Sequence, residues 1–181
     1  RNVNQIASIN LSKYKAIVLC GHPSEQNALK LKTFINNGGG VLLAPGSETT
    51  YQEFSSMLLT LGVKAPSSAA GQQDNIDNIM RFQKIEFEHP VFDKMFTDDQ
   101  KRKIDSPEIY YYFKMTASPN ILPLIALEDN SALLSESSIS KGKLFVLSTS
   151  PVFSSTNFPL KGFFVPLINK SVNYLASSKN G

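Results

Sequence analysis

The sequence predicts an α/β fold in which a parallel sheet is extended by antiparallel strands in the second half of the chain. Two observations support this prediction. Residues 16–20 and 41–44 are short, wholly apolar runs separated by an amphipathic stretch, which is typical of strands buried on both faces of a parallel sheet. After residue 109, four strand-like segments follow one another closely, with turn residues between them.

The first unit runs from Tyr14 to Gly46. Its strand Ala16–Cys20 stops at Gly21, and the helix that follows places apolar residues at helical spacing, namely Ala28, Leu29, Leu31, Phe34 and Ile35. The run Gly38–Gly40 follows a helix and opens a strand, whereas a dinucleotide loop follows a strand and opens a helix. We therefore interpret it as a helix stop and tight turn leading into Val41–Ala44. Two buried strands joined by one helix are expected to run parallel.

The middle of the chain predicts one further helix and several short elements. The helix is expected over Tyr51–Leu61, with Gly62 as its C-terminal cap and Ser47 or Thr49 as its N-terminal cap. Residues 66–73 are small and polar and predict an exposed loop. A half-exposed strand is expected over 84–88, and a short helical turn over 91–96.

In the second half, strands are expected over Ile109–Met115, Ile121–Leu127, Ala132–Glu136 and Lys143–Thr149, and a last helix over Gly162–Ala176. The apolar run 144–147 is expected to return to the centre of the sheet. In the aromatic run Tyr110–Phe113, alternate rings face opposite sides, so we expect one pair in the core and the other in a patch for a partner.

Composition excludes several classes of protein. The 181 residues are 41% hydrophobic and 18% charged, which fits one packed domain spanning 1–181. A net charge of +3 does not favour nucleic acid as a partner. The basic cluster Lys101–Lys103 is expected to be a solvated loop or helix end rather than a phosphate or lipid site. With one cysteine and two histidines, neither a disulfide framework, a metal site nor a cofactor is predicted.

No apolar run approaches the roughly 20 residues that a membrane helix needs. The chain begins at Arg1 without a signal-peptide pattern, so we expect it to be a piece of a longer protein.

The first candidate site is Cys20-Gly21-His22, just beyond the carboxyl end of a strand, where open α/β sheets bind their ligands. Cys20 and His22 have the chemistry of a nucleophile and its base, with Glu25 or Glu48 as a group to orient the imidazole. The alternatives are a buried or semi-buried, structural Cys20, which we favour, and a ligand contact through Gly21 and His22.

The second candidate site is the loop Pro45–Thr49, which follows a strand and precedes a helix. Gly46, Ser47 and Glu48 are its candidate ligand-binding residues, although helix capping by Ser47 or Thr49 is the simpler interpretation. The loop lacks the G-x-S-x-G spacing that would make Ser47 a nucleophile.

Tyr14–Leu19 followed by Leu31–Gly46 resembles the class I glutamine amidotransferase-like fold. More narrowly, the chain resembles the C-terminal soluble domain of BatA-type (aerotolerance-associated) membrane proteins of Bacteroidetes. That resemblance rests on an ordered series of short motifs: His89–Phe92, Gly142–Phe145, Ser150-Pro151, Asn157–Pro159 and Phe164–Pro166.

The resemblance implies a three-layer α/β sandwich with a flavodoxin/Rossmann-like sheet. It also implies a domain on the periplasmic side of an inner-membrane protein, attached to the membrane only through flanking segments. True amidotransferases carry their nucleophilic cysteine at the turn that Pro45-Gly46 matches, and no histidine follows His89 to supply their late His-x-Glu pair. The resemblance therefore predicts a non-catalytic interaction or scaffold domain with a protein partner. A small-ligand module or a Cys20/His22 hydrolase are the alternatives.

Overall fold

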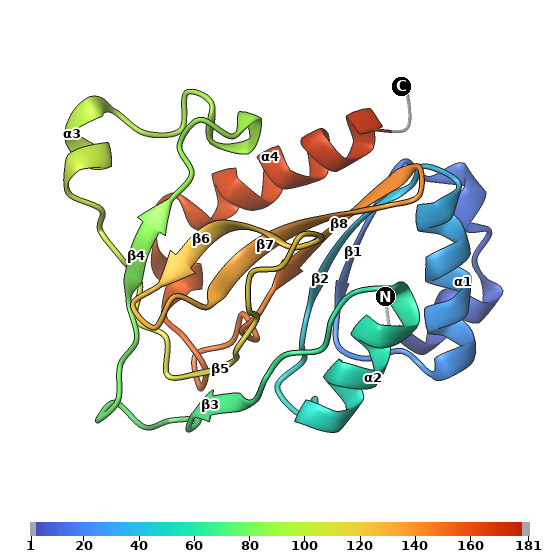
Figure 1. Ribbon diagram of the computed structural model, residues 1–181, viewed down its shortest axis with the longest axis horizontal. Helices are drawn as coiled ribbons and strands as arrows, with labels where there is room; N and C mark the ends of the chain where they lie inside the picture. The colour runs from blue at the N-terminus through green and yellow to red at the C-terminus, as the bar shows by residue number, and fades with distance from the viewer. Residues whose placement is uncertain (1–2, 179–181) are drawn as a thin grey trace.

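The computed structural model describes residues 3–178. Its main sheet has six strands in the order β1-β2-β8-β7-β6-β4, and a small second sheet pairs β3 with β5. Helices α1 and α2 cover one face of the main sheet and α4 covers the other (Figure 1). The strands are β1 Ala16–Cys20, β2 Gly40–Ala44, β3 Ala69–Gly71, β4 Phe82–Ile85, β5 Tyr111–Phe113, β6 Leu122–Leu127, β7 Ala132–Ile139 and β8 Gly142–Leu147. The α-helices are α1 Glu25–Asn36, α2 Tyr51–Leu61, α3 Asp98–Arg102 and α4 Phe164–Ser177.

The sheet combines the two pairing modes that the sequence predicts. Strands β1, β2 and β8 are parallel neighbours, and β7, β6 and β4 continue the sheet in antiparallel pairs. Strand β8 lies between β2 and β7, so the expectation that residues 144–147 return to the centre of the sheet is confirmed.

The glycine run after α1 is confirmed as a helix stop and tight turn. Gly38 has φ +95°, the left-handed conformation that glycine adopts without cost. A Cβ at Gly39 would lie 2.3 Å from the ring of Phe34, and one at Gly40 would lie 2.6 Å from Leu175 of α4. Close packing of α1 and α4 around this turn therefore requires the absence of side chains at both positions.

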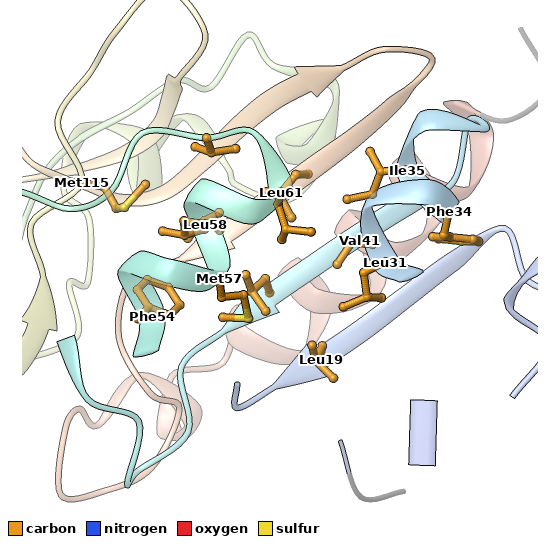
Figure 2. Close-up of a cluster of buried hydrophobic side chains, with 14 of the residues drawn as sticks. Leu19, Leu31, Phe34, Ile35, Val41, Phe54, Met57, Leu58, Leu61 and Met115 are labelled. Atoms are coloured by element: carbon orange, nitrogen blue, oxygen red, sulfur yellow. The ribbon is translucent and has the colours of Figure 1, made fainter. Parts of the chain in front are cut away.

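The core between α1, α2 and the sheet is shown in Figure 2, where Leu31 and Ile35 of α1 lie toward α2 and Val41, and Phe34 lies on the side of α1 away from α2. One residue expected on the apolar face of α1 does not lie in this core: Leu29 is 52% exposed. Asn27 is instead buried beside Ala28. Leu29 is separated from Ala28 by one helical step of about 100°, which turns it off the apolar stripe.

The core on the opposite face is formed by α4 and the second half of the chain. Pro166 lies in the first turn of α4, where the lack of an N–H is harmless, as expected. Leu167, Ser171 and Leu175 of α4 face this core. It also contains Val91 and Phe92, from the 3₁₀ turn η3 Pro90–Phe92 that was expected near residues 91–96.

Three expectations about the middle of the chain are corrected. The expected loop 66–73 contains β3, which pairs with β5. The N-terminal cap of α2 is Thr50 rather than Ser47 or Thr49, because Glu53 completes a capping box with it. The aromatic run forms no exposed patch: Tyr111 and Phe113 pack on the α1/α2 side, and Tyr112 packs on the α4 side.

The described part of the chain begins with two 3₁₀ segments that the sequence did not predict, η1 Val3–Ser8 and η2 Leu11–Lys13. The basic cluster Lys101–Lys103 forms the end of α3 and its C-terminal cap, and its exposed residues confirm the expected solvated helix end. Within the described residues, no helix is long and apolar enough to cross a membrane.

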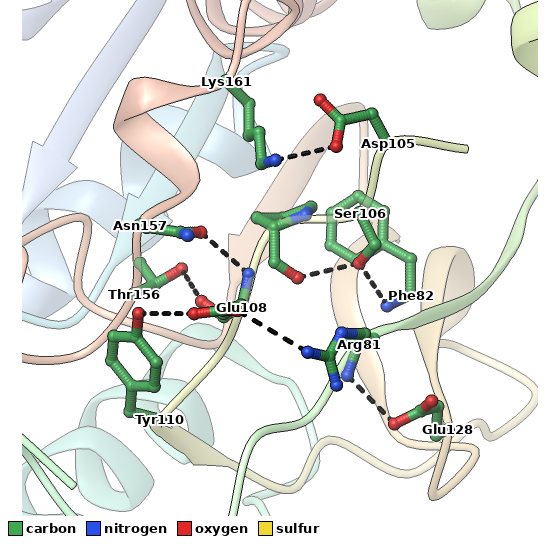
Figure 3. A network of polar contacts seen from close by, with 11 residues as sticks. Arg81, Phe82, Asp105, Ser106, Glu108, Tyr110, Glu128, Thr156, Asn157 and Lys161 are labelled. Atoms are coloured by element: carbon green, nitrogen blue, oxygen red, sulfur yellow. Dashed lines mark hydrogen bonds and ion pairs between the residues drawn. The ribbon is translucent and has the colours of Figure 1, made fainter. Parts of the chain in front are cut away.

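A polar network joins the segment before β5 to the loop after β8 (Figure 3). The backbone N–H of Glu108 donates to Asn157 Oδ1 at 2.8 Å, and Thr156 Oγ1 donates to the Glu108 carbonyl at 2.7 Å. The Glu108 carboxylate accepts from Tyr110 and lies 3.5 Å from Arg81. These bonds anchor the irregular connections of the second half to the sheet.

Candidate functional site

A hollow of about 510 Å³ opens between the N-terminal half of α1 and the length of α2, from Gln52 to Thr60. Its His22 end lies beyond the carboxyl end of β1, the side on which an open α/β sheet binds its ligands. Among the residues that the sequence singled out, His22 and Glu25 line it, whereas Glu48 does not. The other lining residues are Pro23, Ala28, Gln52, Glu53, Ser56, Met57, Leu59 and Thr60.

His22 uses both ring nitrogens within the loops around it. Nδ1 lies 3.2 Å from Thr49 Oγ1, and Nε2 lies 3.3 Å from Glu53 Oε1. Nδ1 shares a hydrogen bond with the Thr49 hydroxyl, and Nε2 lies within ion-pair distance of the Glu53 carboxylate. The buried Thr49 oxygen also accepts from the Gly46 N–H at 2.9 Å. The loop after β1 is thereby tied to the loop after β2.

Glu53 is the member of this group that the sequence analysis missed. The N–H of Thr50 donates to its carboxylate, and this bond together with the nearby His22 lowers the pKa of Glu53. The capping-box pattern Thr50-x-x-Glu53 is the sequence signal that could have placed Glu53 in the first turn of α2. Its contact with an imidazole 31 positions earlier, however, depends on how β1 and β2 pair.

Cys20 is exposed at the surface, so a fully buried cysteine is ruled out, although its thiol is partly shielded from solvent. Its thiol lies 3.4 Å from the Pro45 carbonyl, and desolvation raises its pKa. Side chains at every second position of a strand lie on the same face, so Cys20 shares a face of β1 with Ala16 and Val18. Ala16 packs on the α4 side of the sheet. His22 instead pairs with Thr49 and Glu53 beside α2. The structure therefore does not bring the thiol and the imidazole together.

The remaining predicted ligand-binding residues lie around the hollow but do not line it. Gly21 and Gly46 are adjacent, since a Cβ on Gly46 would lie 3.3 Å from the Gly21 Cα. Ser47 and Glu48 are exposed, and the carbonyl of Ser47 accepts from Gln73 at 2.8 Å. Within residues 3–178, no group of three or more His, Cys, Asp or Glu side chains is arranged to hold a metal ion.

A second polar cluster lies on the α4 side of the sheet. His89 Nε2 is 2.8 Å from Glu136 Oε2, and Lys143 Nζ is 3.0 Å from Glu136 Oε1. The Tyr174 hydroxyl of α4 contacts both Glu136 and Lys143. Desolvation opposes the charge of Lys143, but its bonds to Tyr174 and Glu136 prevail and raise its pKa. This cluster joins two of the motifs on which the family resemblance rests, His89–Phe92 and Gly142–Phe145.

The layers and the sheet order define this chain as an α/β sandwich with a mixed six-stranded sheet between helices. Two solved structures are similar over most of their length. They are the cytoplasmic protein STM3548 from Salmonella typhimurium (TM-score 0.65, 19% identity, 94% of this chain and 74% of that one) and the cytoplasmic protein STM1381 from Salmonella typhimurium LT2 (TM-score 0.64, 18% identity, 97% and 76%).

A third similar structure is the β-galactosidase from Bacillus circulans sp. alkalophilus. It has a TM-score of 0.54 and 12% identity, over 90% of this chain and 23% of the enzyme. At such identities, the similarity establishes the fold alone. No protein-family model and no curated protein matches the sequence.

Proposed function

We propose that this chain is a non-catalytic interaction or scaffold domain. The observation that carries the proposal is that both nitrogens of His22 are engaged in holding two loops together. The hydroxyl that faces this imidazole belongs to Thr49, which is buried and also accepts from the Gly46 N–H, so the imidazole faces no hydroxyl that a substrate can reach. The turn Pro45-Gly46 offers no nucleophile, and the raised pKa of Cys20 disfavours a thiolate at neutral pH.

Enzymatic assays and cysteine labelling test this proposal directly. We expect the purified domain to turn over neither glutamine nor p-nitrophenyl esters. We also expect iodoacetamide to alkylate Cys20 more slowly at pH 7 than it alkylates a free thiol, because less of the thiol is ionised. Turnover that disappears in Cys20→Ala would overturn the proposal.

A second candidate function is small-ligand binding in the hollow between α1 and α2. The observation that favours it is the presence of two carboxylates, Glu25 and Glu53, beside His22 in the lining. Such a lining suits a small molecule that carries a cationic or hydroxyl group. A thermal-shift screen with polyamines, amino acids and sugars tests this function. A rise in melting temperature that Gln52→Trp abolishes would support it, and a flat screen would exclude it.

The setting that we propose follows from the family resemblance: a domain of a longer envelope protein, held on the periplasmic side of an inner membrane. Cell fractionation and protease accessibility of the full-length protein in intact spheroplasts test this location. Recovery of the full-length protein in the soluble cytoplasmic fraction would contradict it.

A further inference from the structure

Strand β1 forms an open edge of the main sheet. It is the first strand in the sheet order, so only β2 pairs with it in the part of the chain that the structure describes. At the two ends of β1, the Gly40 N–H donates to the Lys15 carbonyl and the Gly21 N–H donates to the Ala44 carbonyl. These two bonds fix which residues of β1 face β2. The residues whose backbone groups bond to β2 are Lys15, Ile17, Leu19 and Gly21. Because backbone groups alternate along a strand, the N–H and C=O groups of Ala16, Val18 and Cys20 point away from β2.

Within Ala16–Cys20, this edge lacks three features by which proteins protect open strands. Such edges usually carry a lysine, a proline or a bulge. The strand reads Ala-Ile-Val-Leu-Cys, and its pairing with β2 has no register shift. Val18, at its centre, is 54% exposed. A regular edge with an exposed apolar centre is therefore available for another strand.

An apolar cleft lies directly beside the open edge. The N-terminal arm, residues 3–14, runs beside α1 at this side of the sheet (Figure 1). Lys30 of α1 anchors it by donating to the carbonyls of Ile6 and Ile9 at 2.8 and 2.7 Å. Between the arm and β1 remains a cleft of about 360 Å³. Its lining is Val3, Ile6, Ile9, Leu11, Tyr14, Ala16, Ile17, Val18, Leu19 and Leu31.

We propose that β1 and this cleft bind an extended segment of a partner protein, which adds to the sheet as a seventh strand. This inference rests on the proposed interaction function and names the surface that performs it. The backbone of the segment pairs with Ala16, Val18 and Cys20, and its side chains at alternate positions enter the cleft. Because the lining carries no charged side chain, those alternate residues are apolar.

A second copy of this chain fits the surface less well. Its own β1 would satisfy the backbone groups of the edge. Its Leu19, however, is already buried under its own α1, and Ile17 packs against the same core. These side chains cannot also fill a neighbour's cleft, so a free extended segment is the occupant that satisfies both the edge and the cleft.

Selection from an mRNA-displayed library of random 12-residue peptides tests the proposal. We expect enriched peptides with apolar residues at alternate positions. In a complex with such a peptide, amide hydrogen exchange at Ala16, Val18 and Cys20 should slow. Val18→Pro removes an N–H that β2 does not use, and proline is tolerated at such positions of edge strands. It should weaken binding about tenfold, through the lost bond and the changed edge. Val18→Thr keeps the N–H and should bind within about threefold of the wild type.

Three outcomes would overturn the proposal: no enrichment, binding unaffected by Val18→Pro, or exchange at the three edge amides unchanged by the peptide. Dimerisation through β1, detected by sedimentation and lost in Val18→Pro, would assign the edge to a second copy instead. These experiments measure binding or hydrogen exchange and not turnover. The proposal about β1 can therefore fail while the proposed non-catalytic function is upheld. Turnover dependent on Cys20 would refute the proposed function and leave the edge result intact.

Discussion

The Nε2 atom of His89 lies 2.8 Å from Glu136 Oε2, and this contact joins η3 to the middle of the sheet across 47 positions of sequence. The N–H of Val91 donates to His89 Nδ1 at 3.2 Å, so Nε2 carries the proton in the neutral ring and donates to Glu136. The carboxylate is buried and also receives Lys143, so that one acidic group holds η3, β8 and α4 together.

Replacing Glu136 with glutamine should destabilise the fold strongly. The change leaves Lys143, which is largely shielded from solvent, without its countercharge, and removing one partner of a buried pair costs on the order of 3 kcal/mol. Urea denaturation measures the loss. In the double variant Glu136→Gln/Lys143→Met, the loss should be smaller because no unpaired charge remains.

Lys84→Met is the matched control for this prediction. Lys84 and Glu86 form an exposed pair, whose removal should change stability by no more than about 0.5 kcal/mol. If Glu136→Gln proved as mild as this control, the cluster would not have the structural role assigned to it.

Thr49→Val should destabilise the loops around the hollow. The valine cannot accept from the Gly46 N–H or hydrogen-bond to His22, and an unsatisfied buried donor costs about 1–3 kcal/mol. Chemical denaturation measures this change. Ser47→Ala, an exposed position in the same loop, serves as the control and should remain within about 0.5 kcal/mol of the wild type. Equal effects of the two substitutions would contradict the role given to Thr49.

Gly142→Ala should be costly because of close packing at the start of β8. A Cβ there would lie 2.2 Å from the Ile35 carbonyl oxygen and 2.3 Å from that of Gly39. Overpacking of this kind costs about 1–3 kcal/mol. Gly162→Ala, where nothing lies within 4 Å, should leave the melting temperature nearly unchanged. A neutral Gly142→Ala would show that the two backbone segments separate easily.

Asp129 should make stability depend on pH in the acid range. Desolvation opposes its charge, but bonds from Ser131 and Tyr112 prevail and lower its pKa in the folded state. Its contribution is therefore complete above the unfolded value of about 3.9 and is lost as the pH falls through the lower folded value. Urea titrations between pH 6 and pH 2 should show a smaller loss in Asp129→Asn than in the wild type. Identical pH profiles would refute this assignment.

Local sequence patterns determined the elements whose signals are contained within one segment. The strands β1 and β2, the helix Tyr51–Leu61 with its Gly62 cap, and the stop at Gly38 were all predictable. In each case a periodicity or a left-handed glycine requirement acts over a few neighbouring residues. The absence of a nucleophile at Pro45-Gly46 is likewise evident in the sequence. Burial on both faces is confirmed for β2 and wrong for β1, because β1 lies at the edge of the sheet.

The pairing of strands decided the rest, because it brings together residues that are distant in the chain. Only the parallel placement of β1 beside β2 sets His22 against Glu53, and the same strand turns Cys20 toward the opposite side. Residues 69–71 became a strand because β5 was available to pair with them. Glu136 lies in a strand that the sequence predicts, but its partners come from η3, β8 and α4. Long-range packing and burial selected these contacts, and no periodicity within a single segment encodes them.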